Sequence, residues 1–205
     1  DVAVSASGVF ADSSVGTGDA ANASATAKTV TLTSTYSGAD VGNYTIMDQA
    51  TTTATINKRV LDLSGRTDVT AQDKIYDGDT AATVDDSGIT TAVLESVGLI
   101  SGDSLGTITA TGTFASADVA YGGDTVISQT VNLSYDPLTG ADAGNYDIQW
   151  QQTASATITP KALSVSGITV SNKVYDGQLT ATVVYSTPTF TGLVSRSGVD
   201  DDVTV

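Results

Sequence analysis

The sequence has 205 residues, of which 23 are acidic and 8 are basic, so its formal net charge is −15. A charge of this size and sign repels nucleic acid and anionic lipid, and no apolar run is long enough to span a bilayer, so neither nucleic-acid binding nor membrane insertion is expected. The chain has no Cys and no His, which excludes disulfides and thiolate metal sites and removes the commonest general base.

The composition favours β structure over helix. Thr and Val are abundant and Gly numbers 20, whereas Glu occurs once, at Glu95. An acidic, Thr-rich and cysteine-free chain is what we expect of a bacterial surface protein. Because the sequence begins without Met and without the pattern of a signal peptide, we read it as an internal piece of a longer protein.

The first 59 residues contain one clear strand pattern. Val30 and Leu32 alternate with Thr in residues 28–33, which is the period-two pattern of a half-buried strand. The stretch 12–22, rich in Gly, Asp and Ser, is expected to be a loop.

A corner motif follows this strand. Asp40, Gly42 and Tyr44 have the residue order of a tyrosine corner, in which a turn delivers a Tyr to the start of a strand and its hydroxyl bonds to upstream backbone. Two short strands, at 44–47 and 53–56, are then expected to form a hairpin.

A new unit is expected to begin near residue 60, where an apolar run precedes Tyr76-Asp77-Gly78, a strong turn signal. A helical turn is allowed only in residues 88–100. A second corner, Asp142, Gly144 and Tyr146, comes just before the last two strands. The strands of this unit are expected at 81–84, 107–110, 130–135 and 156–160.

The turn motif and the corner motif each occur twice, about 100 residues apart. Tyr175-Asp176-Gly177 follows Tyr76-Asp77-Gly78 by 99 residues, and Tyr146 follows Tyr44 by 102. A period near 100 predicts globular units rather than a solenoid of short coils. We therefore predict an all-β chain of tandem immunoglobulin-like β-sandwich repeats of about 100 residues.

The repeat phase divides the chain into three parts. Residues 1–59 are expected to be the C-terminal part of a repeat, 60–161 a complete repeat, and 162–205 the N-terminal part of the next. The two end pieces together are about as long as the complete unit. We hypothesise that they complete each other's sandwich, between neighbouring molecules or within a continuous repetitive polymer.

These motifs resemble the YDG repeat family. The resemblance rests on both Tyr-Asp-Gly turns and on Ala141-Asp142-Ala143-Gly144-Asn145-Tyr146, followed by Ala156-Thr157-Ile158-Thr159-Pro160. Such repeats occur in tandem in very large bacterial surface and secreted proteins, including filamentous-haemagglutinin-like adhesins. The resemblance implies extracellular repeat domains that act as a stalk or filament body.

The recurring residues have a structural interpretation that we prefer to a chemical one. In both Tyr-Asp-Gly turns the Tyr is expected to pack in or over the core, while Asp-Gly supplies turn geometry that other residues resist. The corner tyrosines are interpreted in the same way. No enzyme activity is expected, because the acids lie in recurring turns and the sequence suggests no aromatic-lined cleft.

Two chemical hypotheses remain open. A structural Ca²⁺ could be held by acidic clusters, with weak candidate ligands Asp77, Asp79, Asp200, Asp201 and Asp202, although no stretch matches a known calcium loop and the same acids are also typical of solvated surface loops. Apart from this, no cofactor is expected. A covalent crosslink from Lys74 or Lys173 to an Asn or Asp is the second hypothesis.

The expected function is mechanical and spatial. The chain is predicted to be a structural segment of a bacterial adhesin or filament at the cell surface, with neighbouring repeats of the same protein as its partners. The main alternative is a carbohydrate- or protein-binding module that uses the loops 12–22, 85–106 and 116–128, in which Tyr121 is the one aromatic residue.

Overall fold

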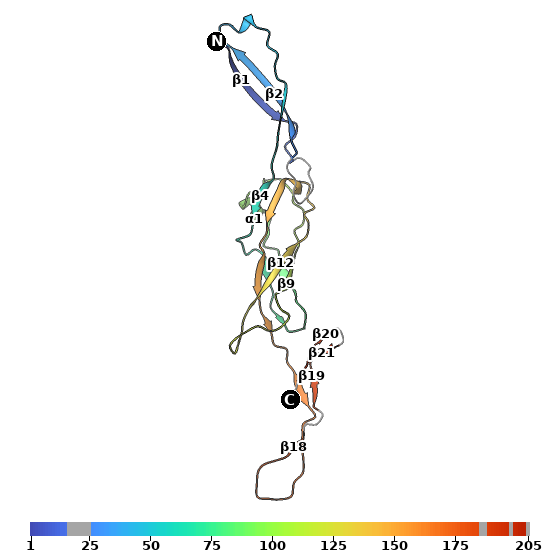
Figure 1. Cartoon of the computed structure of the whole chain (residues 1–205). Helices are drawn as coiled ribbons and strands as arrows, with labels where there is room; N and C mark the ends of the chain where they lie inside the picture. The colour runs from blue at the N-terminus through green and yellow to red at the C-terminus, as the bar shows by residue number, and fades with distance from the viewer. Residues whose placement is uncertain (16–25, 185–187, 197–198, 204–205) are drawn as a thin grey trace. The chain divides into compact units, whose positions relative to one another are not determined.

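A computed structural model describes residues 1–15, 26–184, 188–196 and 199–203, and strands dominate it, as an all-β chain requires (Figure 1). The one α-helix of the described residues is α1 (Thr91–Ser96), and two 3₁₀ turns are η1 (Val41–Asn43) and η2 (Ala143–Asn145). The strands are β1 (Ala3–Phe10), β2 (Lys28–Ser37), β3 (Thr51–Ala54), β4 (Arg59–Asp62), β5 (Thr70–Ala71), β6 (Lys74–Ile75), β7 (Ala81–Ala82), β8 (Val84–Asp85), β9 (Ala110–Phe114), β10 (Tyr121–Gly122), β11 (Thr125–Val126), β12 (Gln129–Tyr135), β13 (Tyr146–Gln149), β14 (Thr153–Ala156), β15 (Ile158–Thr159), β16 (Ser164–Ser166), β17 (Thr169–Val170), β18 (Val183–Val184), β19 (Thr189–Thr191), β20 (Ser195–Arg196) and β21 (Val199–Asp200).

The chain forms two compact units, each assembled from separate stretches of sequence. The first comprises Asp1–Arg66, Ser87–Thr109 and Asp136–Gln151. The second comprises Thr67–Asp86, Ala110–Tyr135 and Gln152–Val205. Within the described residues, no helix is long and apolar enough to cross a bilayer.

The first unit contains a three-stranded antiparallel sheet in the order β1-β2-β3. In β2 every second side chain turns away from solvent, so that Val30 is buried and Leu32 half-buried while the intervening Thr residues are exposed. This alternation confirms the strand predicted at 28–33, because consecutive side chains of a strand point to opposite faces. Phe10 of β1 lies opposite Val30.

The same unit also holds a hydrophobic core. In it β4 pairs in parallel with β13, and Leu61 and Leu63 pack with Leu94 of α1 and with Tyr146. Thr90 is the N-cap of this helix, and its side chain accepts a hydrogen bond from the Val93 N–H at 3.2 Å, a standard N-cap arrangement. The helical turn expected within residues 88–100 is thus confirmed.

The second unit is built around a four-stranded antiparallel sheet in the order β14-β12-β9-β7. Phe114 of β9 and Val131 of β12 lie opposite each other, and both are fully buried. Gly112 is required in β9, because a Cβ there would lie 2.5 Å from Val84 Cγ1 and 2.9 Å from Val131 Cγ1.

Short strand pairs of the second unit recur along the chain. β5 pairs with β8, placing Thr70 opposite Asp85, and β17 pairs with β18, placing Thr169 opposite Val184. Each pair brackets one Tyr-Asp-Gly turn. The backbone therefore follows the sequence repeat, while the boundaries at residues 59/60 and 161/162 remain predictions.

Several strand predictions were wrong in detail. Residues 44–47 form no strand, and β3 pairs with β2 instead of with them, so the predicted hairpin is absent. Of residues 107–110 only Ala110 belongs to a strand, β9. The stretches 81–84 and 156–160 each form two short strands with a break between them, and most of the predicted loop 12–22 lies outside the described residues.

Candidate functional site

The second corner, Asp142 to Tyr146, is a turn in the first unit that leads into a strand. The 3₁₀ turn η2 leads directly into β13, whose first residue is Tyr146, and the Tyr146 side chain is only 4% exposed. Its hydroxyl donates to Asp103 Oδ2 at 2.5 Å and accepts from the Ile100 N–H at 3.1 Å. The expected hydrogen bond between the Tyr hydroxyl and upstream backbone is therefore present. The hydroxyl also binds the carboxylate of Asp103, a residue that lies outside the sequence motif.

Burial and the Asp103 carboxylate act on the pKa of this hydroxyl in the same direction. Burial raises the pKa of Tyr146, and the Asp103 carboxylate that accepts its proton raises this pKa further. Asp142 binds the same loop, since its Oδ2 accepts from the Ser104 N–H at 2.9 Å and its own N–H donates to the Ser104 carbonyl at 3.0 Å. A Cβ at Gly144 would meet no atom within 4 Å, so close packing does not require a glycine there.

The first corner has the same backbone but different surroundings. The 3₁₀ turn η1 ends at Tyr44 in extended geometry, as η2 does at Tyr146. Tyr44, however, is 66% exposed, and Asp40 pairs with the amino group of Asp1 at 2.8 Å. A Cβ at Gly42 would again meet nothing. The turn therefore forms from local sequence, whereas burial of its Tyr depends on residues elsewhere.

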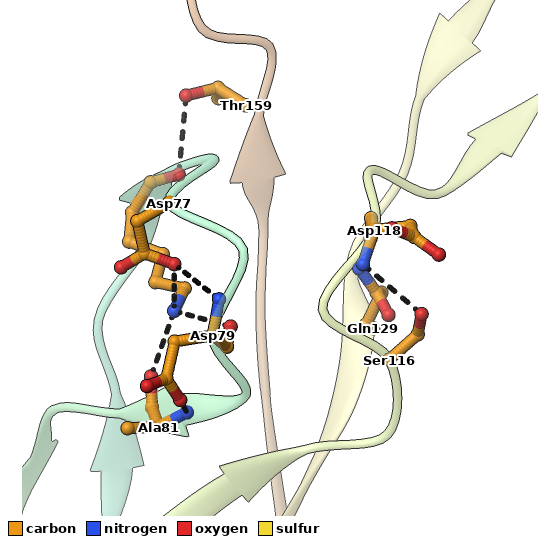
Figure 2. A network of polar contacts seen from close by, with 8 residues as sticks. Asp77, Asp79, Ala81, Ser116, Asp118, Gln129 and Thr159 are labelled. Carbon is orange, nitrogen blue, oxygen red and sulfur yellow. Dashed lines mark hydrogen bonds and ion pairs between the residues drawn. The ribbon is translucent and has the colours of Figure 1, made fainter. Parts of the chain in front are cut away.

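The first Tyr-Asp-Gly turn is organised by a lysine (Figure 2). Lys74 Nζ lies 2.8 Å from Asp77 Oδ1 and donates to the carbonyls of Asp79 at 2.7 Å and Ala81 at 3.1 Å. Asp77 Oδ1 also accepts from the Asp79 N–H at 3.0 Å, and Gly78 takes φ 79°, a conformation that disfavours residues with a Cβ. The structural interpretation of Asp-Gly is consistent with this geometry.

The second Tyr-Asp-Gly turn reproduces the first. Lys173 Nζ lies 2.9 Å from Asp176 Oδ1 and 2.7 Å from the Gln178 carbonyl, and the Gln178 N–H donates to Asp176 Oδ1 at 2.9 Å. Gly177 has φ 73°. In each turn the lysine hydrogen bond holds the pKa of the aspartate, Asp77 or Asp176, below its ordinary value.

The two turns differ in what covers them. Lys74 Nζ lies 5.6 Å from the centroid of the Phe114 ring, within range of a cation–π contact. Tyr76 is half-buried and its hydroxyl donates to Asp201 Oδ2 at 2.6 Å, whereas Tyr175 is almost fully exposed. Tyr76 is thus partly covered, whereas Tyr175 does not pack in or over the core as expected.

The acidic residues considered for Ca²⁺ mostly have other partners. Asp77 Oδ1 binds Lys74, Asp79 Oδ1 accepts from the Ala81 N–H at 2.7 Å, and Asp201 Oδ2 accepts from Tyr76. Asp202 is exposed, and the side chain of Asp200 lies outside the described part of the chain. No three acidic side chains gather around a common point among the described residues, and the Ca²⁺ hypothesis stays a prediction.

A pocket of the first unit has a volume of about 470 Å³. The residues that line it are Ser13, Ser14, Val15, Ile56, Asn57, Arg59, Ile100, Asp103, Asp142, Asn145 and Tyr146. Asn145 Oδ1 accepts from the Val15 N–H at 2.9 Å at its margin. The corner motif therefore contributes to a pocket that its spacing did not reveal.

The sequence analysis did not identify the lysines that stabilise the two Tyr-Asp-Gly turns, or the Asp103 carboxylate that binds the corner tyrosine. The role of Lys74 and Lys173 could have been found, because a lysine stands three residues before the Asp of both Tyr-Asp-Gly turns. Asp103 had no such signal, since 43 residues separate it from Tyr146 and no comparable partner was evident for Tyr44.

The chain matches one known protein family. The family model of the YDG domain matches residues 57–156 and 159–205, which together make up more than half of the chain. Neither the curated proteins nor the solved structures yielded a match. The recurring Lys-x-Tyr-Asp-Gly geometry and this match lead to one conclusion: the chain belongs to the YDG domain family.

Proposed function

We propose that the chain is a structural repeat segment of an extracellular bacterial adhesin or filament, in which tandem immunoglobulin-like β-sandwich units of about 100 residues act as stalk, spacer or polymer body. The observation that carries this proposal is the repetition of one turn geometry. Lys74 with Asp77 and Lys173 with Asp176 make the same ion pair, at 2.8 and 2.9 Å, between strand pairs of the same register.

Repetition of this kind supports a role in building length. A ligand site needs polar groups left available to a ligand, whereas Asp77, Asp142 and Lys74 use theirs on backbone groups and on each other. The net charge of −15 opposes non-specific aggregation of such units. Neighbouring repeats are then the natural partners of each unit.

Immunolabelling of the cells that make the protein tests the proposal. Antibodies raised against this chain are expected to label intact cells, with gold particles at a distance from the envelope that grows with the number of repeats. Antibodies against a cytoplasmic protein provide the control. Labelling that appears only after permeabilisation would exclude an extracellular stalk.

A carbohydrate- or protein-binding module is the second candidate, and the pocket of about 470 Å³ favours it. Ser13 and Asp103, which line this pocket, come from two of the loops predicted to form a site. Asn57→Trp would fill the pocket, and Thr125→Trp places the same ring on an exposed strand residue as a control. Saturable binding to a glycan or peptide array that Asn57→Trp alone abolishes would establish this function; binding unchanged by Asn57→Trp would exclude the pocket.

A further inference from the structure

The first Tyr-Asp-Gly turn lies beside the link between the two stretches that match the YDG domain. The strand β6, which begins at Lys74, pairs in parallel with β15, which ends at Thr159. The Tyr76 N–H donates to the Thr159 carbonyl at 2.8 Å, and the Thr159 hydroxyl donates to the Lys74 carbonyl at 3.2 Å (Figure 2). Because the first match ends at residue 156 and the second begins at 159, these bonds hold Tyr76 where the chain passes from one YDG domain to the next.

The Tyr76 side chain reaches into the second matched stretch. Its hydroxyl donates to Asp201 Oδ2 at 2.6 Å, across a sequence separation of 125 residues. Tyr76 also lines a pocket of about 140 Å³, and every other residue that lines this pocket belongs to the second stretch, among them Leu163 and Val194. The turn of one domain is therefore in contact with the next domain through its tyrosine.

Burial in the second stretch resumes where it meets this tyrosine. Residues 160–184 are all exposed. Gly192 and Leu193, which line the pocket with Tyr76, are half-buried, and Val194 is only 7% exposed. A Cβ at Gly192 would lie 2.7 Å from the Ala162 carbonyl oxygen, so the backbone packs closely at this point. The contact with Tyr76 thus involves a packed part of the second stretch.

A hairpin fixes the carboxylate that accepts the tyrosine hydroxyl. In it β20 pairs with β21, and Ser195 lies opposite Asp200. The Asp201 N–H donates to the Val194 carbonyl at 2.8 Å, which continues the pairing by one more bond. Residues 192–196 and 199–201 form what we call the receiving loop, and its hairpin holds Asp201 beside the buried Val194.

The first matched stretch contains a loop of the same kind. Residues 98–101, Gly-Leu-Ile-Ser, correspond to residues 192–195, Gly-Leu-Val-Ser, and the two glycines have φ of 118° and 111°. The Asp103 N–H donates to the Ile100 carbonyl at 3.0 Å, and Asp103 Oδ2 accepts from the Tyr146 hydroxyl at 2.5 Å. In both domains this loop presents a carboxylate to a tyrosine hydroxyl.

We propose that the tyrosine of the Tyr-Asp-Gly turn fastens one YDG domain to the next, and that the receiving loop is the surface of the following domain that binds it. The hydroxyl makes a charge-assisted hydrogen bond to Asp201, and the ring adds apolar surface to the pocket that Leu163 and Val194 line. Asp77 and Gly78 form the turn itself. The inference rests on the proposed structural role and deepens it, because it names a contact by which consecutive domains hold each other.

Hydrogen exchange of the full chain, measured by NMR, tests this contact. Tyr76→Phe removes the hydroxyl and keeps the ring, so the Asp201 amide should exchange on the order of tenfold faster. The Leu133 amide lies in β12, in the sheet of the first match, and should keep its rate. Tyr175→Phe is the matched control, because it makes the same change in the other Tyr-Asp-Gly turn, where the tyrosine is exposed.

The other outcomes contradict the proposal in different ways. An unchanged rate at Asp201 in Tyr76→Phe, or an equal increase from Tyr175→Phe, would overturn it. Equal acceleration at Asp201 and Leu133 would show that Tyr76 stabilises its own domain rather than the joint, and would overturn it too. None of these results affects labelling of intact cells, so the stalk role and the joint fail separately.

Substitutions of Asp201 provide the second half of the test. Asp201→Leu removes the acceptor and should accelerate exchange in β20 and β21 as much as Tyr76→Phe does. In Asp201→Asn the amide oxygen still accepts from the hydroxyl, so part of the protection should remain. Tyr76→Phe with Asp201→Leu should exchange no faster than either single variant, because both remove the same contact. Additive acceleration would overturn the proposal.

Limited proteolysis gives a measure that needs no assigned amides. Chymotrypsin cleaves after aromatic residues and leucine, and the second stretch offers Tyr175, which is 94% exposed, and Leu193, which is half-buried. Tyr76→Phe should raise the ratio of initial cleavage after Leu193 to that after Tyr175 several-fold. Asp202→Asn, which removes an exposed carboxylate next to Asp201, should leave the ratio unchanged. A ratio that Tyr76→Phe does not move would overturn the proposal.

Discussion

The sheet β1-β2-β3 and the sheet β14-β12-β9-β7 have the same pairing register, with Phe10 opposite Val30 and Phe114 opposite Val131, yet among the described residues only the second has a fourth strand, β7, which covers the edge of β9. Phe114 is fully buried in one, and Phe10 is half-buried in the other. The comparison separates two contributions to a fold. Strand pairing follows from local alternation and turns, whereas burial depends on a segment delivered from elsewhere.

Removing the aromatic ring tests this difference and has the largest expected effect. Phe114→Ala should lower the free energy of unfolding by about 3–5 kcal/mol, because it leaves a cavity in a closed core. Phe10→Ala should cost less than half as much in dilute solution. Chemical denaturation followed by circular dichroism measures both. Equal losses would mean that the first sheet is as well covered as the second.

The corner tyrosines provide the next test. Tyr146→Phe leaves Asp103 and the Ile100 N–H without their shared partner, which should cost about 1–3 kcal/mol of stability. Tyr44→Phe should change the unfolding free energy by no more than a few tenths of a kcal/mol, because Tyr44 is exposed. Thermal unfolding of the two variants beside the unchanged chain decides. A similar loss from Tyr44→Phe would indicate a partner for that hydroxyl.

Substitution of glycine by alanine should have a smaller effect, and one that differs between Gly78, which has a positive φ, and Gly144, which has no close neighbour. Gly78→Ala places a Cβ on a residue with φ 79° and should cost about 1 kcal/mol. Gly144→Ala meets no neighbouring atom and should be close to neutral or slightly stabilising. Melting temperatures of the two variants measure the contrast. A neutral Gly78→Ala would show that the turn relaxes to another conformation.

Acid should have the smallest effect, and it should be similar in both turns. Since the pKa of Asp77 and of Asp176 is lowered in the fold, the stability from each ion pair is complete above the ordinary carboxyl pKa of 3.8 and is lost as pH falls through the lowered value. Asp77→Asn should therefore reduce the loss of stability between pH 4 and the acid limit. Asp202→Asn, at an exposed position, is the control; if it gave the same reduction, general charge rather than the turn would explain the effect.

Local patterns were sufficient for much of the fold. Alternation of Val30 and Leu32 with Thr predicted β2, the strand predicted at 130–135 coincides with β12, the helical turn was placed correctly, and the recurring Asp-Gly identified both turns. The failures were long-range. Residues 44–47 have the sequence of a strand, but no strand in the described part of the chain pairs with them, whereas the equivalent β13 pairs with β4.

The residues of the candidate site likewise divide into those that local patterns predict and those that depend on long-range contacts. Tyr146 and Asp142 could be predicted because their spacing recurs, and Lys74 could have been, since it precedes each turn at a fixed distance. Asp103 could not, because the loop that carries it is brought to Tyr146 by packing of Leu99 and Leu105 rather than by any local pattern. The pocket beside the corner could not be predicted for the same reason.

The parallel pair of β4 and β13 determines how a pull along the chain is resisted. Arg59 lies at the start of the pair and Gln149 at its end, since Tyr146 faces Arg59 and Gln149 faces Asp62. Tension that enters at Arg59 and leaves after Gln149 therefore slides the two strands past each other. In this shear geometry the ladder hydrogen bonds bear the load together, whereas an antiparallel hairpin pulled from its open end unzips one bond at a time.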